Sequence, residues 1–297
     1  MTDTEHGQLS IDALSAPDAL TVMLASHEAA MRCVMAAQPA ILEAARRMAA
    51  TLASGGTLHY AAAGSSGLMA LADASELPGT FGISQSQIRV CMAGGVPVDG
   101  RMPGNTEDDS ADGAQAAQAL KDGDLAIVLS ASGTTPYACA FAETARLAGH
   151  SVIGIANIPG SALLTLATVA ITLPTAAEVI AGSTRLGAGT AQKVALNMMS
   201  TQAGTLLGHV HDGMMVNLNP DNIKLRARAT DIVCAVARVP RDAAEAALLQ
   251  ADFDTKCAIL IAMGVTPESA RHLLGQAKGR LRDILPGLAK STTPVSS

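Results

Sequence analysis

The sequence predicts an α/β fold in which a five-stranded parallel sheet is flanked by helices and followed by a small C-terminal helical module. Five short apolar runs alternate with helical patterns between residues 57 and 173, and strands that alternate with helices form parallel sheets with right-handed crossovers. Segments rich in Gly, Ser and Thr follow three of these runs. The 297 residues are 49% hydrophobic and 15% charged, so the chain can build a large core and is not disordered as a whole.

Two Ala-rich helices are expected first, between residues 18 and 53, with a break at Pro39 and an end at Ser54-Gly55-Gly56. The five expected strands follow as apolar runs at residues 57–63, 88–93, 124–130, 151–156 and 168–173. The last three runs are rich in β-branched residues and lack alternation, which is typical of strands covered on both faces. Helical patterns fill the gaps at residues 66–76, 109–120, 136–148 and 161–166.

The C-terminal third of the chain is predicted to be helical. Residues 183–237 have a helical pattern throughout, with a break allowed near Asp212-Gly213, and residues 240–286 predict three short helices. We therefore expect three parts: N-terminal helices at 1–53, a sheet domain at 54–237, and the small helical module with its tail at 238–297.

Composition and charge exclude several kinds of partner. The net charge is −6 and no basic run occurs, so nucleic acid is not an expected partner. The apolar stretch between Pro159 and Pro174 is shorter than the ~20 residues that cross a bilayer, so no membrane partner is expected. The start of the chain lacks the pattern of a signal peptide, and the five scattered cysteines form no C-x-x-C pair. These features predict reduced thiols in a cytoplasmic protein.

Hydroxyl-bearing segments follow the first, third and fifth expected strands. They are Gly64-Ser65-Ser66-Gly67, the segment Ser130-Ala131-Ser132-Gly133-Thr134-Thr135, and, after Glu178, Gly182-Ser183-Thr184-Arg185. In an open parallel sheet, ligands bind beyond the carboxyl ends of the strands, and hydroxyls with helix N-termini form anion cradles. Ordinary helix caps are the alternative for each segment alone, but three at one edge favour a phosphate site. No P-loop or dinucleotide fingerprint is present.

Two glutamates stand out in surroundings that are poor in charge. Glu76 lies in an Asp-Ala-Ser-Glu segment, and Glu107 precedes the helix expected at 109–120. Paired carboxylates can divide the roles of general acid and base. The alternative is that Glu107 favours a helix N-terminus and Glu76 lies on a solvated face.

The same segments resemble a known family. The Gly64–Gly67 segment, Asp73–Phe81, Thr106–Asp109, Ser132-Gly133 with Thr135-Pro136-Tyr137, and Gly182–Leu186 followed by Ala188–Lys193 are similar to N-acetylmuramic acid 6-phosphate etherases. The resemblance runs from Leu9–Ser15 to the helical module at 240–286. It implies the flavodoxin-like fold of the SIS (sugar isomerase) domain.

The resemblance also implies an activity. Members of this family cleave the lactyl ether of N-acetylmuramic acid 6-phosphate, which gives N-acetylglucosamine 6-phosphate and D-lactate by elimination and hydration, without a metal or cofactor. By this resemblance Glu76 is the acid that protonates lactate, and Glu107 is the base that removes the C2 proton. It implies amino-sugar catabolism, a role in peptidoglycan recycling and a homodimer. The apolar helices at 18–53 and 183–207 also favour a dimer, since they exceed what one sheet face needs. The binding residues it implies are those of the three hydroxyl-bearing segments together with Glu178.

The chain departs from the family pattern at four positions. Leu68, Thr134 and Gly187 stand where the family has basic residues, and Leu77 stands where it has Cys. A regulator that binds a sugar phosphate without catalysis, or a sugar-phosphate isomerase, therefore remains an alternative function. The pair His209 and His211 lacks a Cys, Asp or Glu cluster and is not expected to hold a metal.

Overall fold

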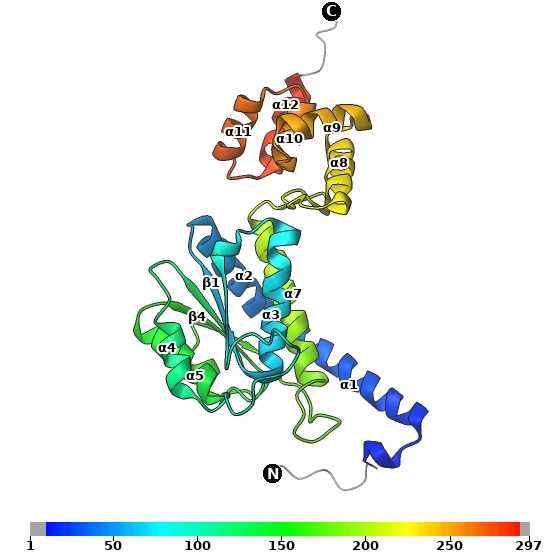
Figure 1. The fold of residues 1–297 in the computed structure, drawn as a ribbon. Helices are drawn as coiled ribbons and strands as arrows, with labels where there is room; N and C mark the ends of the chain where they lie inside the picture. The colour runs from blue at the N-terminus through cyan, green and yellow to red at the C-terminus, as the bar shows by residue number, and fades with distance from the viewer. Residues whose placement is uncertain (1–9, 292–297) are drawn as a thin grey trace, which may run out of the picture. The chain divides into compact units, whose positions relative to one another are not determined.

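The computed structural model describes residues 10–291 and divides the chain into two compact units (Figure 1). The first unit comprises the chain up to Arg47, Gly56–Ala74 and Ile88–Met199, and the second comprises Met48–Gly55, Ser75–Gln87 and the chain from Ser200. The boundaries expected at residues 53 and 237 stay predictions.

The first unit contains the predicted five-stranded parallel sheet. Its order, β2-β1-β3-β4-β5, is that of flavodoxin-like folds and confirms the predicted fold class. Every residue of β1 and β3 is buried, which explains why the third apolar run lacks alternation. Leu58 of β1 pairs with Ile88 on one side and with Leu125 on the other. The strands are β1 (Leu58–Ala62), β2 (Ile88–Met92), β3 (Leu125–Leu129), β4 (Ser151–Ala156) and β5 (Val169–Thr172).

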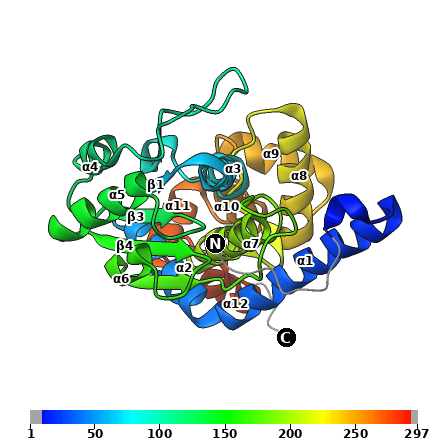
Figure 2. The same ribbon diagram turned by 90° about the horizontal axis from the view of Figure 1, so that it is seen from below.

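Helices precede, connect and follow these strands (Figure 2). The predicted break at Pro39 is confirmed, because one helix ends at Ala36 and the next begins at Gln38. The helix after β1 continues through Pro78 to Phe81, beyond its predicted end at residue 76, since Ala74, Leu77 and Phe81 are buried on one helical face. The elements are η1 (Ile11–Ala13), α1 (Ala16–Ala36), α2 (Gln38–Ala53), α3 (Gly64–Phe81), η2 (Gln85–Gln87), α4 (Ser110–Ala117), α5 (Pro136–Leu147), α6 (Ala162–Leu166) and α7 (Gly187–Leu206).

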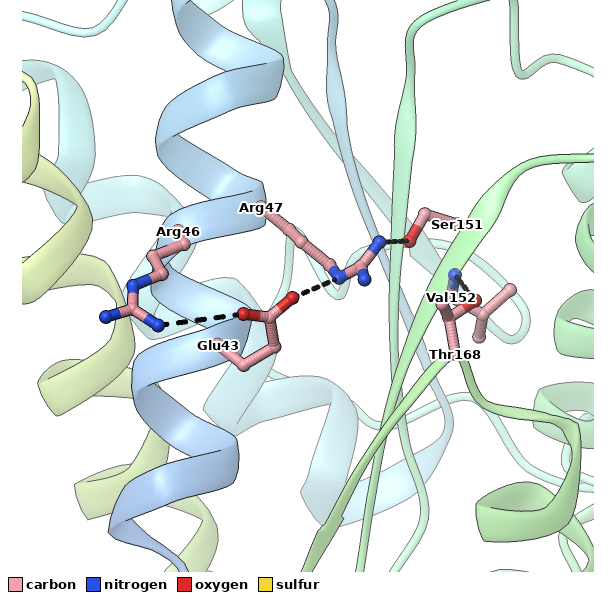
Figure 3. A network of polar contacts seen from close by, with 6 residues as sticks. All are labelled: Glu43, Arg46, Arg47, Ser151, Val152 and Thr168. Atoms are coloured by element: carbon pink, nitrogen blue, oxygen red, sulfur yellow. Dashed lines mark hydrogen bonds and ion pairs between the residues drawn. The ribbon is translucent and has the colours of Figure 1, made fainter.

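One sheet face packs against α5 and α6 through small and branched side chains. Phe141 and Ala145 of α5 and Leu163 of α6 form a buried cluster with Ala126 and Val152 of the sheet. At the amino end of β4, Arg47 of α2 donates to Glu43 (3.0 Å) and to Ser151 (3.2 Å), as Figure 3 shows. Partly exposed ion pairs of this kind contribute about 1 kcal/mol or less, so packing rather than charge holds the layers together.

The second unit includes a hairpin that the helical pattern did not predict. The helical pattern expected over 183–237 is interrupted where a break was allowed, near Asp212-Gly213, but by a hairpin: β6 (Val210–His211) and β7 (Met214–Met215) separate α7 from α8 (Ile223–Ala237). The turn residues Asp212 and Gly213 have φ values of 46° and 75°, and an Asp-Gly pair with positive φ favours a tight hairpin over a helix.

The C-terminal module has more helices than expected. Up to residue 291, four follow α8, namely α9 (Arg241–Gln250), α10 (Thr255–Ala262), α11 (Pro267–Gln276) and α12 (Leu281–Ser291), where three short helices were predicted. Asp252 and Phe253 have positive φ values of 50° and 62°, so the helical conformation is interrupted between α9 and α10. Val233 of α8, Ala247 of α9 and Ile259 of α10 share one buried core with α11 and α12.

Two further findings concern the environment of the chain. Across residues 10–291, no helix combines the length and the apolar character that a bilayer crossing requires. Cys33, Cys91, Cys139, Cys234 and Cys257 are all free thiols. Burial raises the pKa of the Cys91 thiol to about 11, so this thiol is unreactive at neutral pH.

Candidate active site at the carboxyl edge of the sheet

The strand order places two of the hydroxyl-bearing segments next to each other. β1 and β3 are neighbours in the sheet, and Ala62 at the end of β1 pairs with Leu129 at the end of β3. The chain after β1 leads through α3 to β2, on one side of this pair, and the chain after β3 leads through α5 to β4, on the other. Such a switch in direction opens a crevice at the carboxyl edge, where parallel sheets bind ligands.

The segment Gly64–Gly67 forms the first turn of α3 rather than a loop. Gly64 has a φ of +53°, and a Cβ atom at this position would collide with the carboxylate of Glu107. A Cβ at Gly67 would meet the side chain of Met92 at 2.9 Å. Ser65 is exposed and Ser66 is buried. The positive φ and the Glu107 contact together favour glycine at position 64, and the α3 N-terminus directly borders Glu107.

Glu107 lies in the loop between β2 and α4, and its side chain is exposed. Its backbone carbonyl accepts a hydrogen bond from the Tyr137 amide at 3.1 Å, which ties the loop to the first turn of α5. Its side chain lies against the start of α3, where the positive end of the helix dipole favours a carboxylate. The alternative role, a charge at the start of α4, belongs instead to Asp109, whose side chain accepts from the Asp112 amide at 2.9 Å.

The segment after β3 forms a cluster of hydroxyls. The Ser130 hydroxyl lies 2.7 Å from that of Thr135 and accepts from the Gly133 amide at 3.0 Å. Ser132 and Thr134 are exposed, and the Ser132 hydroxyl accepts from both the amide and the hydroxyl of Thr134. Thr135 precedes α5, but its side chain makes no capping hydrogen bond. Ordinary capping therefore does not explain this segment, and the first amides of α5 have no side-chain cap from Thr135.

The third segment is arranged differently. Glu178 accepts from the amides of Gly187 (3.2 Å) and Ala188 (2.8 Å), so its carboxylate caps the N-terminus of α7. The Ser183 hydroxyl accepts from the Arg185 amide at 3.4 Å, and the Thr184 carbonyl accepts from the Gly189 amide. Thr184 and Arg185 are exposed. The α7 N-terminus already holds a carboxylate, and the contribution of Glu178, Ser183, Thr184 and Arg185 to ligand binding stays a prediction.

Asn157 was not among the predicted site residues, although it follows β4 at the same edge. It is buried and donates to the Leu173 carbonyl at 3.1 Å, while its side-chain oxygen accepts from Gln192 at 3.0 Å. The backbone amide of Asn157 also donates to the Ala131 carbonyl at 3.0 Å. Asn157 therefore connects the ends of β4 and β5 with α7 and with the segment Ser130–Thr135, the hydroxyl segment. The position of Asn157 directly after a strand, the signal that also marked the segment Ser130–Thr135, could have identified it as a residue of this edge.

Glu76 is exposed on α3, one helical turn after the buried Asp73. It belongs to the second unit and Glu107 to the first, so the juxtaposition of their two carboxylates stays a prediction. The pair His209 and His211 joins no metal-ligand set: the described residues contain no group of three His, Cys, Asp or Glu side chains that could hold a metal ion. Burial lowers the pKa of His209 to about 4.

The fold and the site edge define the class of protein. A model of the SIS domain matches residues 25–157, and the structure of a phosphoheptose isomerase from Francisella tularensis shares the fold. That structure is 20% identical, with a TM-score of 0.50 over 65% of this chain and 100% of that chain. At the level of the whole sequence the likeness is closer. The chain is 38% identical to an N-acetylmuramic acid 6-phosphate etherase from Deinococcus radiodurans, over 91% of this chain and 90% of that protein. It is also 38% identical to the enzyme of that name from Pasteurella multocida, over 93% and 92%. The chain belongs to the N-acetylmuramic acid 6-phosphate etherase family.

Proposed function

We propose that this protein is a carbon–oxygen lyase that converts N-acetylmuramic acid 6-phosphate and water into N-acetylglucosamine 6-phosphate and D-lactate. Relatives with this activity in their names are 38% identical over more than nine-tenths of the chain. The observation that carries the proposal is the position of Glu107. Its carboxylate lies against the first turn of α3, and its backbone is bonded to the first turn of α5, directly after the hydroxyl segment.

The hydroxyl segment is the proposed phosphate site. Ser130, Ser132, Thr134 and Thr135 supply hydroxyls, Gly133 allows close approach of the backbone, and the α5 N-terminus adds favourable dipole charge. The α3 N-terminus is less suited to phosphate, because the Glu107 carboxylate already lies there. A phosphate held at α5 leaves the sugar carbons free to extend toward Glu107.

The proposed reaction follows from the chemistry of the open-chain sugar. The C1 aldehyde acidifies the C2 proton, which Glu107 removes, and the C3–oxygen bond breaks as the electron pair leaves with lactate. Glu76 donates a proton to the departing lactyl oxygen. Water then adds to the C2–C3 double bond with the roles reversed: Glu76 accepts a proton from water and Glu107 returns one to C2. Such acid and base catalysis contributes about 10²–10⁴-fold each.

The active form is proposed to be a cytoplasmic homodimer. Four large apolar side chains on α1 are exposed at helical spacing: Leu20 (67%), Leu24 (60%), Met31 (46%) and Met35 (65%). A stripe of this kind is suited to a second copy of the same helix, and the five free thiols suit a reducing compartment. Light scattering should give about twice the 30.0 kDa chain mass, and Leu24→Glu should lower that value.

An assay for D-lactate released from N-acetylmuramic acid 6-phosphate tests the proposal. The expected result is stoichiometric lactate and N-acetylglucosamine 6-phosphate. If the folded protein releases no lactate, yet a sugar phosphate at 100 Kd stabilises it by about 2.7 kcal/mol, the protein is a sugar-phosphate regulator and the lyase proposal is wrong. Interconversion of hexose 6-phosphates without lactate would instead indicate an isomerase.

A further inference from the structure

Asp73 is a buried acidic residue of the first unit, on helix α3. It is 3% exposed, and its carboxylate accepts from the Tyr60 hydroxyl at 3.0 Å and from the Asn197 side-chain amide at 2.9 Å. Tyr60 lies on β1 and Asn197 on α7. Asp73 therefore bonds α3 both to the sheet and to the neighbouring helix.

Stability alone is a weak reason for such a group. Removing a carboxylate from water costs several kcal/mol, and apolar replacements of buried ionic networks are often as stable. Burial, followed by the negative charge of Asp73, raises the pKa of Tyr60 well above its ordinary value, so the hydroxyl stays a donor at every physiological pH. The network acts as a directional restraint, because hydrogen bonds specify the rotation of a helix more sharply than apolar contacts do.

We propose that Asp73 is a positioning residue for Glu76, an inference that rests on the proposed lyase function. Glu76 follows Asp73 by one turn on the continuous helix α3, so the rotation of α3 that the Tyr60 and Asn197 bonds define also sets the direction of the Glu76 side chain. A displacement of 1 Å at a reacting group can cost about 10²-fold in rate. Glu107 is held by a different element, the loop bonded to Tyr137, and does not depend on this restraint in the same way.

A matched control exists in the same unit. Asp124 is also buried and accepts from His59 (3.0 Å) and from the amides of Thr57 and Lys121, but it precedes β3 at the opposite edge of the sheet. Asp73→Asn and Asp124→Asn therefore both replace a buried carboxyl group by an amide, and only the first alters α3. Tyr60→Phe is a milder variant that removes one hydrogen bond and keeps the Asp73 carboxyl group.

The test compares lactate release with exchange of the C2 hydrogen in heavy water. For Asp73→Asn we expect kcat for lactate release to fall about 10- to 100-fold with KM nearly unchanged, while C2 exchange, the work of Glu107, is largely retained. Tyr60→Phe should show the same pattern more weakly, and Asp124→Asn should change neither rate selectively. Equal losses of exchange and release in Asp73→Asn and Tyr60→Phe, or behaviour like that of Asp124→Asn, would overturn the positioning role. If the wild-type protein releases no lactate, the lyase function itself fails and this inference fails with it.

Discussion

The two edges of the sheet carry polar groups that are used in opposite ways. At the amino edge, Asp124 is buried and its carboxylate receives two backbone amides and the His59 ring within 3.0 Å. At the carboxyl edge, Ser132 and Thr134 are exposed, and Glu107 presents an exposed side chain beside the α3 N-terminus. Both edges contain a carboxylate and nearby donors, but only the amino edge encloses them.

The comparison distinguishes polar groups that hold the fold together from polar groups that are available to bind a ligand. A buried carboxylate with several donors is already satisfied and has no capacity for a substrate. Exposed hydroxyls that bond mainly to one another can exchange those bonds for bonds to phosphate oxygens at little cost. The following predictions test this contrast, beginning with the largest expected effect.

The two glutamates should dominate activity. Glu107→Gln and Glu76→Gln should each lower turnover about 10²–10⁴-fold, the range for a lost general acid or base, while sugar-phosphate binding persists. Glu107→Gln should also abolish C2 exchange in heavy water, whereas Glu76→Gln should retain some. Near wild-type turnover in both variants would show that these carboxylates are surface charges without a catalytic role.

Gly64 should be the most sensitive glycine at the carboxyl edge. Gly64→Ala places a Cβ in a residue with φ of +53° and against the Glu107 carboxylate, so we expect kcat to fall at least about tenfold beyond any loss of stability, which should be about 1–2 kcal/mol. Gly55→Ala is the matched control, because Gly55 has a φ of +85° but nothing within 4 Å of its Cβ position. Steady-state kinetics with equal losses in both variants would contradict the contact with Glu107.

Removing one exposed hydroxyl should weaken binding and leave chemistry almost unchanged. Ser132→Ala should raise KM roughly tenfold, since one hydrogen bond to a charged group contributes about 1.5–3 kcal/mol and backbone amides partly compensate. Ser54→Ala, which removes an exposed hydroxyl that donates to the Thr51 carbonyl at 2.9 Å, is the control. A large loss of kcat with unchanged KM would show that Ser132 does not belong to the proposed phosphate site.

Substitutions at the amino edge of the sheet should change the stability of the protein and leave its activity unchanged. Burial is the main cause that lowers the pKa of His59 below its ordinary value of 6.5, and the hydrogen bond to Asp124 opposes it. Protonation then favours the unfolded chain, so the free energy of unfolding should fall as the pH drops below about 6.5. His59→Asn should reduce the pH dependence measured by chemical denaturation, and the remaining slope should come from His209 and His211, whose pKa values burial also lowers. An unchanged slope in His59→Asn would show that His59 titrates normally.

Sequence patterns predicted the parts of this fold that depend on local order. Runs such as 124–130 are apolar without alternation, and this pattern identified strands that are buried on both faces. The same patterns could not show that Glu178 caps α7 or that Glu107 borders Gly64, because both contacts depend on how a long loop returns to a helix N-terminus. A break near Asp212-Gly213 was allowed for, but the hairpin itself was not predicted, because helical spacing on both sides outweighed a turn signal of two residues. The resemblance of whole segments, rather than spacing, is the basis for predicting that Glu76 and Glu107 act as a pair.

The most direct test of the account is the destination of solvent atoms in the two products. N-acetylmuramic acid 6-phosphate should be converted in heavy water that also contains heavy oxygen, and both products should be analysed by mass spectrometry. Elimination and hydration predict that the sugar gains one deuterium at C2 and one heavy oxygen at C3, while the ether oxygen leaves with unlabelled lactate. Heavy oxygen in lactate, or a sugar without heavy oxygen at C3, would contradict the elimination and hydration of the lyase mechanism.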